Sequence, residues 1–169
     1  MSEAPPTHAA APTGGGPQSL DALYAVPPPW DIGRPQPALL DLAESGALCG
    51  WVLDVGCGTG EHTLMAARLG LEATGVDLAT TALAAAERKA RERGLAARFL
   101  QHDVLDLAAL GRSFDTVLDS LVFHGFHSRD RGRYVDGPTC RDCAGRAVFP
   151  ALLPRRTAEP LRTRAPGDP

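Results

Sequence analysis

The chain has no proline between Ala38 and Gly137, although 15 prolines stand elsewhere in its 169 residues. Proline fixes its own φ and removes a backbone donor, so helices and strands can run uninterrupted only where it is absent. We therefore expect a folded domain over residues 37–136. The flanking segments are expected to be a disordered tail at 1–20, a cap segment at 21–36 and an irregular, disordered tail at 137–169.

Other absences narrow the class of protein. No run approaches the roughly 20 apolar residues of a membrane helix, and the N-terminus lacks the basic and apolar regions of a secretory signal. With a net charge of -3 and no long basic run, nothing favours a nucleic acid as the partner. The cysteines are too few and scattered for a disulfide framework: Cys49, Cys57, Cys140 and Cys143. We expect a cytoplasmic protein with reduced cysteines.

Apolar runs and helical patterns alternate along the proline-free stretch. The sequence predicts strands at 51–55, 72–76, 97–101 and 114–118, and helical segments at 37–45, 61–69, 79–93 and 106–110. Strands separated by helices form βαβ units with right-handed crossovers. The predicted fold class is therefore α/β, with a mostly parallel sheet.

A glycine-rich loop, Gly56-Cys57-Gly58-Thr59-Gly60, follows the first predicted strand and precedes a helix. Such a loop can be a structural turn, but glycine also lets backbone N–H groups approach a ligand at the sheet edge. A nicotinamide dinucleotide loop would have its third glycine at position 61, where Glu61 would face the pyrophosphate as a second anion. A ligand with a sulfonium and an amino group tolerates nearby carboxylates such as Asp54.

Two acids follow the next predicted strands. Asp77 lies 21 residues after Gly56, where an acid can accept hydrogen bonds from ribose hydroxyls, although it can also be only a helix cap. Asp103 follows the third strand, where it can accept from an adenine amino group while Val104 N–H donates to the ring. The order of loop and acids makes a nucleoside-containing ligand the favoured interpretation.

In order, Asp54–Gly60, Gly75–Asp77, Gln101–Val104 and Phe114–Leu118 resemble the motifs of class I S-adenosylmethionine-dependent methyltransferases. The resemblance covers about residues 51–126 and implies a Rossmann-like doubly wound sheet with S-adenosylmethionine as cofactor. It assigns the methionine part to the glycines, the ribose to Asp77 and adenine to Asp103 and Val104. The predicted cofactor-binding set is Asp54, Gly56, Gly58, Gly60, Asp77, Leu78, Asp103, Val104 and Trp30.

Trp30 enters that set through a shorter resemblance. Pro29–Pro35 is similar to the N-terminal cap of thiol- and thiopurine-type methyltransferases, which would place Trp30 over the cofactor. Ordinary core packing of this Trp is the alternative. On this segment alone, the acceptor would be a small molecule with a thiol or a related soft nucleophile.

Catalytic candidates follow the fourth predicted strand. Methyl transfer from a sulfonium needs mainly an oriented acceptor, so few catalytic residues are expected. Asp119 could lie near the methionine amino group, and His124 could be a base or line the acceptor pocket, or simply belong to a helix surface or the core. His124 and His127, with Cys140 and Cys143, also resemble two halves of a zinc site, but we expect no metal.

The segment after Gly137 departs from the family pattern, which should continue with a Pro-Gly-Gly-type turn and a fifth apolar strand. The last 33 residues hold six prolines, six arginines and no sustained period. The codons allowed for Ala144–Leu153, shifted forward by one base, permit Pro-Gly-Gly-Arg-Tyr-Phe-Leu-Leu-Cys, which raises the hypothesis of a frameshift.

We therefore expect strands one to four only, with strands five to seven missing or altered and the fourth strand left as an exposed edge. Weak cofactor binding and little or no activity would follow. The alternatives are an inactive cofactor-binding fragment, a nicotinamide-dependent oxidoreductase and, last, a zinc-binding module. Neither the methyl acceptor nor the oligomeric state can be read from the sequence.

Overall fold

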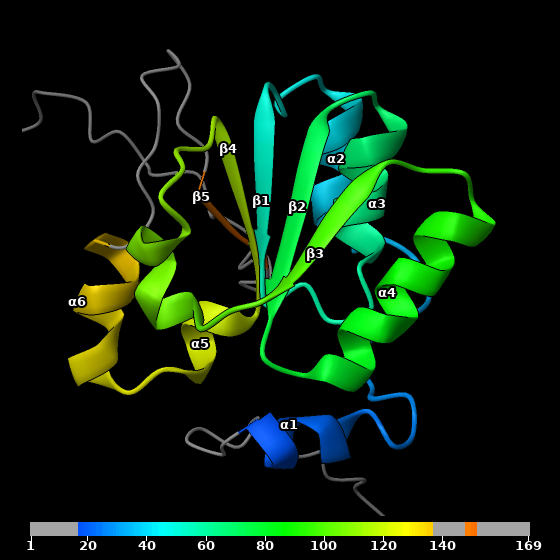
Figure 1. Cartoon of the computed structure of the whole chain (residues 1–169). Helices are drawn as coiled ribbons and strands as arrows, with labels where there is room; N and C mark the ends of the chain where they lie inside the picture. Colours follow the sequence, from blue (N-terminus) through cyan, green and yellow to red (C-terminus); the bar gives the residue numbers. More distant parts are fainter. Residues whose placement is uncertain (1–16, 137–147, 152–169) are drawn as a thin grey trace, which may run out of the picture.

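One parallel sheet runs through the structure, a computed structural model that describes residues 17–136 and 148–151. Its five strands stand in the order β3-β2-β1-β4-β5 (Figure 1), and every neighbouring pair is parallel. The bounds are β1 Trp51–Val55, β2 Glu72–Asp77, β3 Ala97–Gln101, β4 Thr116–Ser120 and β5 Val148–Ala151. The strand order reverses between β1 and β4, which is where doubly wound sheets form ligand sites. The predicted Rossmann-like α/β class is confirmed.

Helices cover both faces of this sheet. On one face lie α2 Pro37–Glu44, α3 Glu61–Arg68 and α4 Thr80–Glu92, and on the other lie η1 Val104–Leu110, α5 Val122–Gly125 and α6 Ser128–Asp136. The seventh, α1 Pro17–Leu23, lies below the carboxyl ends of the strands (Figure 1). None of these described helices has the length and apolar character needed to cross a membrane.

The core follows the alternation of side chains along β1. Val52 packs with Leu39 and Met65 under α2 and α3, whereas Leu53 faces the opposite side and packs with Leu107. Successive strand residues point to opposite faces, so a run that is apolar throughout is buried on both sides. This is why the run at 51–55, apolar except for Asp54, predicts a central strand.

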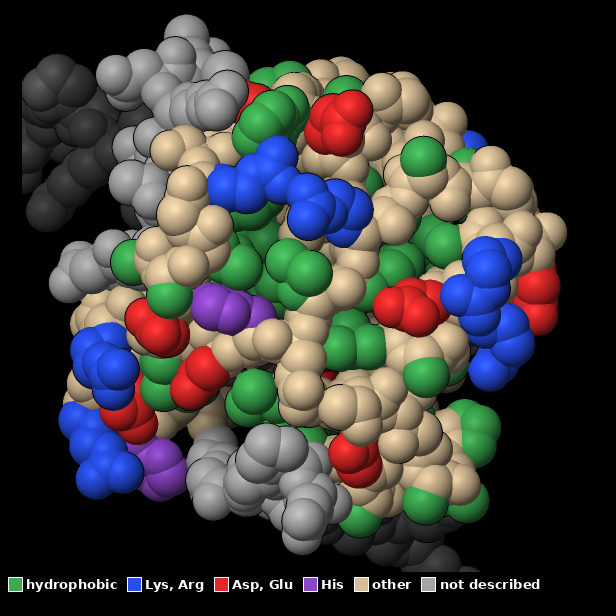
Figure 2. Space-filling view, in the orientation of Figure 1, with side chains coloured by type: hydrophobic (Ala, Val, Ile, Leu, Met, Phe, Trp, Pro, Cys, Tyr) green, Lys and Arg blue, Asp and Glu red, His purple; other side chains and the backbone are tan. Residues whose placement is uncertain are grey.

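α4 shows the matching pattern for a helix. Its inner positions Ala82, Leu83 and Ala86 are buried, and its outer face carries ion pairs one turn apart, Arg88 with Glu92 and Arg91 with Glu87. Figure 2 shows acidic and basic side chains together over this helix, at the right. Exposed pairs of this kind contribute little stability, so burial of the apolar face holds α4 in place.

Several helix and strand boundaries differ from the sequence prediction by one or two residues, among them the start of β4. β4 begins at Thr116, because Asp115 first makes a turn in which its N–H donates to Trp51 O at 2.8 Å and its carboxylate accepts from Trp51 N at 2.7 Å. α1 runs from Pro17 to Leu23, across residue 20, where the sequence analysis ends the N-terminal tail. Proline is well suited to the first turn of a helix because the N–H groups there have no partner within the helix, so the N–H that proline lacks costs no hydrogen bond.

The expectation that β4 is an exposed edge is also wrong. β5 pairs with β4 in parallel register, with Val117 beside Val148 and Ser120 beside Ala151. Pro150 and the surrounding prolines hid this strand in the sequence, but a residue without an N–H is tolerated in an outer strand. The frameshift hypothesis concerns residues 137–169, of which only this strand is described, and the structure does not test it.

Candidate cofactor and acceptor site

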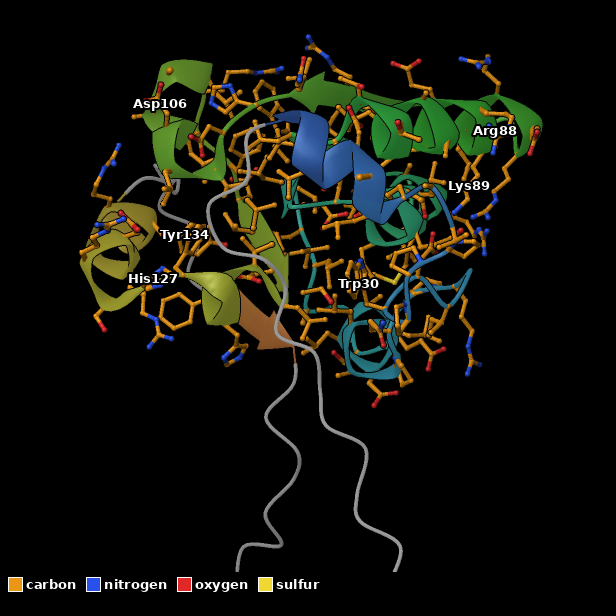
Figure 3. The ribbon with its side chains drawn as sticks, turned by 90° about the horizontal axis from the view of Figure 1, so that it is seen from below. Trp30, Arg88, Lys89, Asp106, His127 and Tyr134 are labelled. Atoms are coloured by element: carbon orange, nitrogen blue, oxygen red, sulfur yellow. The ribbon has the colours of Figure 1, made fainter. Side chains whose placement is uncertain are left out.

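A cavity of about 500 Å³ opens at the carboxyl edge of the sheet. Its walls come from the glycine loop, the ends of β2 and β3, the turn after β4, and the segment from Leu20 to Gln36. Seen from below in Figure 3, Trp30 and His127 lie on opposite sides of the strand ends, and both line the cavity. The predicted loop, acids and cap segment therefore meet at one place.

The three glycines of the loop have left-handed φ angles but different neighbours. Gly56 and Gly58 line the cavity, and a Cβ on Gly58 would lie 2.9 Å from the Tyr24 hydroxyl. Gly60 does not line the cavity, because a Cβ there would lie 2.7 Å from Ala86 Cβ and 2.9 Å from the Phe99 ring. Gly60 thus allows α3 to start against α4 and β3, which is the packing role of a third glycine in such loops.

Asp77 lines the cavity at the end of β2 and also holds the loop. Its Oδ2 accepts from Gly58 N at 2.8 Å, and its Oδ1 accepts from Ala79 N at 2.9 Å. Burial raises the pKa of this carboxyl above its ordinary value, against the lowering effect of the backbone donors. Asp77 is not the N-cap of α4, which is Ala79, and its carboxylate holds two backbone amides while lining the cavity.

Asp54 is buried behind the loop, with 1% of its surface exposed. Its Oδ2 accepts from Thr63 N at 3.0 Å and from Thr63 Oγ1 at 2.7 Å. Its Oδ1 has no hydrogen-bond partner among the described residues and lies 4.0 Å from His62 Nδ1. Asp54 is not among the residues that line the cavity, so the structure does not bring this predicted cofactor-binding carboxylate to the cavity wall, and the nearest N–H group to its Oδ1 is that of His62. Desolvation raises the pKa of Asp54.

His62 connects Asp54 to the cap segment, and the sequence analysis missed it. Its Nε2 accepts from Gln36 N at 3.0 Å, so the proton of the neutral ring is on Nδ1, facing Asp54. Its ring also lines the cavity. The position of His62 one residue after Glu61, on the first turn of the helix that follows the loop, was the available signal.

The two residues predicted to contact adenine, Asp103 and Val104, lie at the edge of the cavity. Asp103 Oδ1 accepts from Leu105 N at 2.9 Å and caps η1. Asp103, Val104 and Leu78 all line the cavity, with Leu105 beside them. A capped turn of this kind holds both an acid and an adjacent backbone N–H at the edge of the cavity.

The cap segment is attached to the loop and to α4 by side-chain bonds. Asp31 Oδ2 accepts from Thr59 Oγ1 at 2.8 Å, and Trp30 O accepts from Gln36 Nε2 at 3.1 Å. Farther back, Asp21 accepts from Thr81 N at 2.8 Å at the start of α4. Trp30 therefore belongs to the cavity wall and not to the buried core.

Glu61 is not the unpaired anion that the sequence analysis assumed. Only 8% of its side chain is exposed, and both oxygens are paired with Arg93, at 2.8 Å each, while Lys89 Nζ lies 2.9 Å from Oε1. Burial alone would raise the pKa of Glu61, but the bonds to Arg93 and Lys89 outweigh it and the pKa is lowered. The repulsion argument against a pyrophosphate therefore loses its force, because two cations neutralise this carboxylate.

The two catalytic candidates are not among the residues that line the cavity. Asp119 is 1% exposed and accepts from Tyr134 Oη at 2.7 Å, Val122 N at 2.9 Å and Phe123 N at 3.1 Å. Desolvation raises its pKa. His124 is exposed on α5, with its ring edge-on to Phe123. His127 lines the cavity in its place, after the four-residue α5 has ended.

Among the described residues no cluster of His, Cys, Asp and Glu could hold a metal ion. Cys140 and Cys143 lie outside the described residues, so the structure does not test the zinc alternative. The prediction of no metal stays a prediction.

Residues 52–137 match the family model described as a methyltransferase domain, and the chain belongs to this family. It is 43% identical over 101 residues to a 2-heptyl-1-hydroxyquinolin-4(1H)-one methyltransferase of Mycobacteroides abscessus, covering 59% of this chain and 44% of that protein. It is 42% identical over 77 residues to a demethylmenaquinone methyltransferase of Thermus thermophilus, covering 44% and 35%. The chain thus spans less than half the length of these curated relatives.

A solved structure gives the same result in three dimensions. The structure described as "Conversion of a Disulfide Bond into a Thioacetal Group during Echinomycin Biosynthesis" superposes with a TM-score of 0.70 at 44% identity, covering 73% of this chain and 57% of that one. The chain is therefore a class I methyltransferase domain, and its cofactor is S-adenosylmethionine. The nicotinamide-dependent oxidoreductase is not supported.

Proposed function

We propose that this chain forms the cofactor-binding part of a methyltransferase that methylates an apolar small molecule on a sulfur or an ionisable oxygen. The observation that supports this proposal most strongly is the composition of the cavity described above. One part of its wall is the bonded glycine loop with Asp77, and another is apolar, with Ile32, Leu121 and Phe126. A mostly apolar wall with a few convergent polar groups is the usual form of a small-molecule site.

The residues at the loop fit S-adenosylmethionine. Gly56 and Gly58 line the cavity with their backbone, and the absence of a Cβ there lets Val122 and Tyr24 pack close to the loop. Asp77 would take the ribose, and Asp103 with Val104 the adenine. When bound, this cofactor supplies a methyl group on a sulfonium, a leaving group that needs no acid.

The chain's own contribution is orientation and exclusion of water. The cap segment, bonded to the loop through Asp31 and to α3 through Gln36, closes one side of the cavity. His127 can accept the proton of an acceptor hydroxyl or thiol, because it lines the cavity where His124 does not. Asp119 would act through the turn that it holds and not through contact with the cofactor.

The acceptor chemistry is suggested by relatives of this chain. One is named for a hydroxyquinolinone, the structure described above concerns a thioacetal, and a further relative, 37% identical over 62 residues, is a probable thiol methyltransferase of Arabidopsis thaliana. Sulfur and ionisable oxygen are both nucleophiles that need only deprotonation. These names support the proposed acceptor class, and the cap segment is consistent with it.

The test is a methyl-transfer assay with S-adenosylmethionine, using 2-heptyl-1-hydroxyquinolin-4(1H)-one and small aryl thiols as acceptors. We expect methylated product, a loss of about 100-fold in His127→Ala, and little change in the matched control His124→Ala. Calorimetric titration with S-adenosylhomocysteine accompanies the assay. Tight binding without product from any acceptor would favour the inactive fragment, whereas absence of binding would contradict the proposed function.

A further inference from the structure

Leu121 is the only non-glycine residue with a positive φ within residues 17–136 and 148–151. Its φ is 79° and its ψ is -8°, in the left-handed region. For a bulky L-residue this conformation costs about 1–2 kcal/mol. A residue keeps this conformation only when the surrounding structure holds it, and such strained residues are concentrated at functional sites.

The Leu121 side chain is also poorly buried for its type. It is 38% exposed and lines the cavity between the end of β4 and the start of α5. Leucines on the sheet faces, such as Leu53 and Leu118, are fully buried. Core packing therefore does not explain why a leucine occupies this strained position.

A buried network holds the turn in which Leu121 sits. Asp119 bonds to Val122 N and Phe123 N, the two amides that follow Leu121, and to the hydroxyl of Tyr134 on α6. Tyr134 is 5% exposed and packs against the Phe126 ring at 5.1 Å between centroids. Figure 3 shows Tyr134 on the same side of the strand ends as His127.

The turn after β1 has the same construction with a different residue. Asp54 is followed two residues later by Gly56 in the left-handed region, as Asp119 is followed by Leu121. Both Gly56 and Leu121 line the cavity. At the first turn glycine avoids strain and leaves space that the Val122 side chain fills, whereas at the second turn the strained residue retains a side chain.

We propose that Leu121 is a specificity-determining residue that contacts the methyl acceptor, with Asp119 and Tyr134 as the positioning residues that hold it there. The inference rests on the proposed function for the identity of the ligand. Leu121 faces the same cavity as Ile32, which is 43% exposed on the cap segment, so the two form an apolar contact surface. The acceptor class that fits them is an apolar ring or chain next to the reacting heteroatom.

The decisive variant is Leu121→Asn, because asparagine has nearly the shape of leucine and tolerates the left-handed conformation. The full chain is loaded with S-adenosylhomocysteine, and the Kd of the hydroxyquinolinone is measured by titration. We expect this Kd to rise about tenfold, since a buried apolar contact becomes polar, while the Kd of S-adenosylhomocysteine changes by less than about twofold. The matched control is Leu69→Asn, at a leucine that is 52% exposed and is not among the cavity-lining residues.

A second pair of variants tests the strain. Leu121→Gly and Leu121→Ala both remove the side chain, but only glycine relieves the positive φ. We expect the glycine variant to have the higher Tm, by about 3–6 °C, although glycine is normally the less stabilising residue. Both variants should weaken hydroxyquinolinone binding.

An unchanged hydroxyquinolinone Kd in Leu121→Asn, or no binding of this probe to the wild-type chain, would overturn the inference. Equal losses of probe and S-adenosylhomocysteine would do the same, because Leu121 would then be only structural. If the wild type binds the probe but does not methylate it, the proposed function fails and the role of Leu121 in ligand contact stands.

Discussion

On both sides of the cavity, carboxylates at the strand ends hold the backbone by accepting hydrogen bonds from its amides, but the residues at positive φ differ. On the cofactor side, acids near the strand ends bind backbone amides, as Asp54 does with Thr63 on α3 and Asp77 with Gly58 in the glycine loop. On the acceptor side, Asp119 binds Val122 and Phe123 in the same way. The residues placed at positive φ differ, being Gly56, Gly58 and Gly60 on the cofactor side and Leu121 on the acceptor side.

This difference matches what each side has to recognise. A cofactor common to a whole family can be bound by backbone groups and a few acids, so residues without a side chain are sufficient on the cofactor side. An acceptor that varies between enzymes has to be recognised by side chains. The comparison predicts that changes on the cofactor side alter stability and cofactor affinity together, and that changes on the acceptor side leave cofactor affinity alone.

The largest expected effect is at Gly60. In Gly60→Ala the new Cβ would meet Ala86 and Phe99 at less than 3 Å, with φ at +85°. Overpacking and strain together should lower the free energy of unfolding by about 3 kcal/mol, measured by urea denaturation. Gly94→Ala is the control, because Gly94 has φ +63° but nothing within 4 Å. It should lose only about 1 kcal/mol, and equal losses would refute the packing role of Gly60.

The next effect concerns cofactor affinity at Asp77. Asp77→Ala removes the acceptor for Gly58 N and Ala79 N as well as the proposed ribose contact. Hydrogen bonds to a charged group are worth about 1.5–3 kcal/mol each, so the Kd of S-adenosylhomocysteine should rise about 30-fold in calorimetry. Asp106→Ala, at an exposed acid that does not line the cavity, should bind normally. If the Kd is unchanged in Asp77→Ala, Asp77 is not the residue that contacts the ribose.

A pH-dependent effect is expected at Glu61. Its pKa is lowered in the folded chain from an ordinary value of 4.5, so the pair with Arg93 and Lys89 contributes stability above pH 4.5. That contribution is lost as the pH falls through the lowered folded pKa. Glu61→Gln should therefore reduce the free energy of unfolding by about 1–2 kcal/mol at pH 7, and the difference from wild type should shrink below pH 4.5. A difference independent of pH would show that the charge of Glu61 is not involved.

The smallest effect tests the acceptor side. Tyr134→Phe removes one hydroxyl that donates to Asp119 at 2.7 Å, while two backbone donors remain. We expect a loss of about 1 kcal/mol in urea denaturation and a change of less than about twofold in the Kd of S-adenosylhomocysteine. A large drop in cofactor affinity would contradict the expectation that changes on the acceptor side leave cofactor affinity unchanged.

The cofactor side was accessible from the sequence because its signals are local. Gly56, Gly58 and Asp77 lie close together in the chain, and parallel strands bring their carboxyl ends to one edge. The acceptor side was less accessible for the opposite reason. Whether His124 or His127 lines the cavity depends on where a four-residue helix ends, and no periodicity can be read over so short an element.

The proline-free stretch, the glycine loop and the spaced acids determined, by themselves, a parallel α/β sheet and the class of cofactor. Only the tertiary structure decided that Glu61 is neutralised by residues about 30 positions away, that β5 covers the edge of β4, and that Asp119 holds a strained leucine. The physical reason is distance along the chain. Periodicity and turn chemistry act between near neighbours, whereas ion pairs, strand order and buried carboxylate contacts depend on which segments the fold brings together.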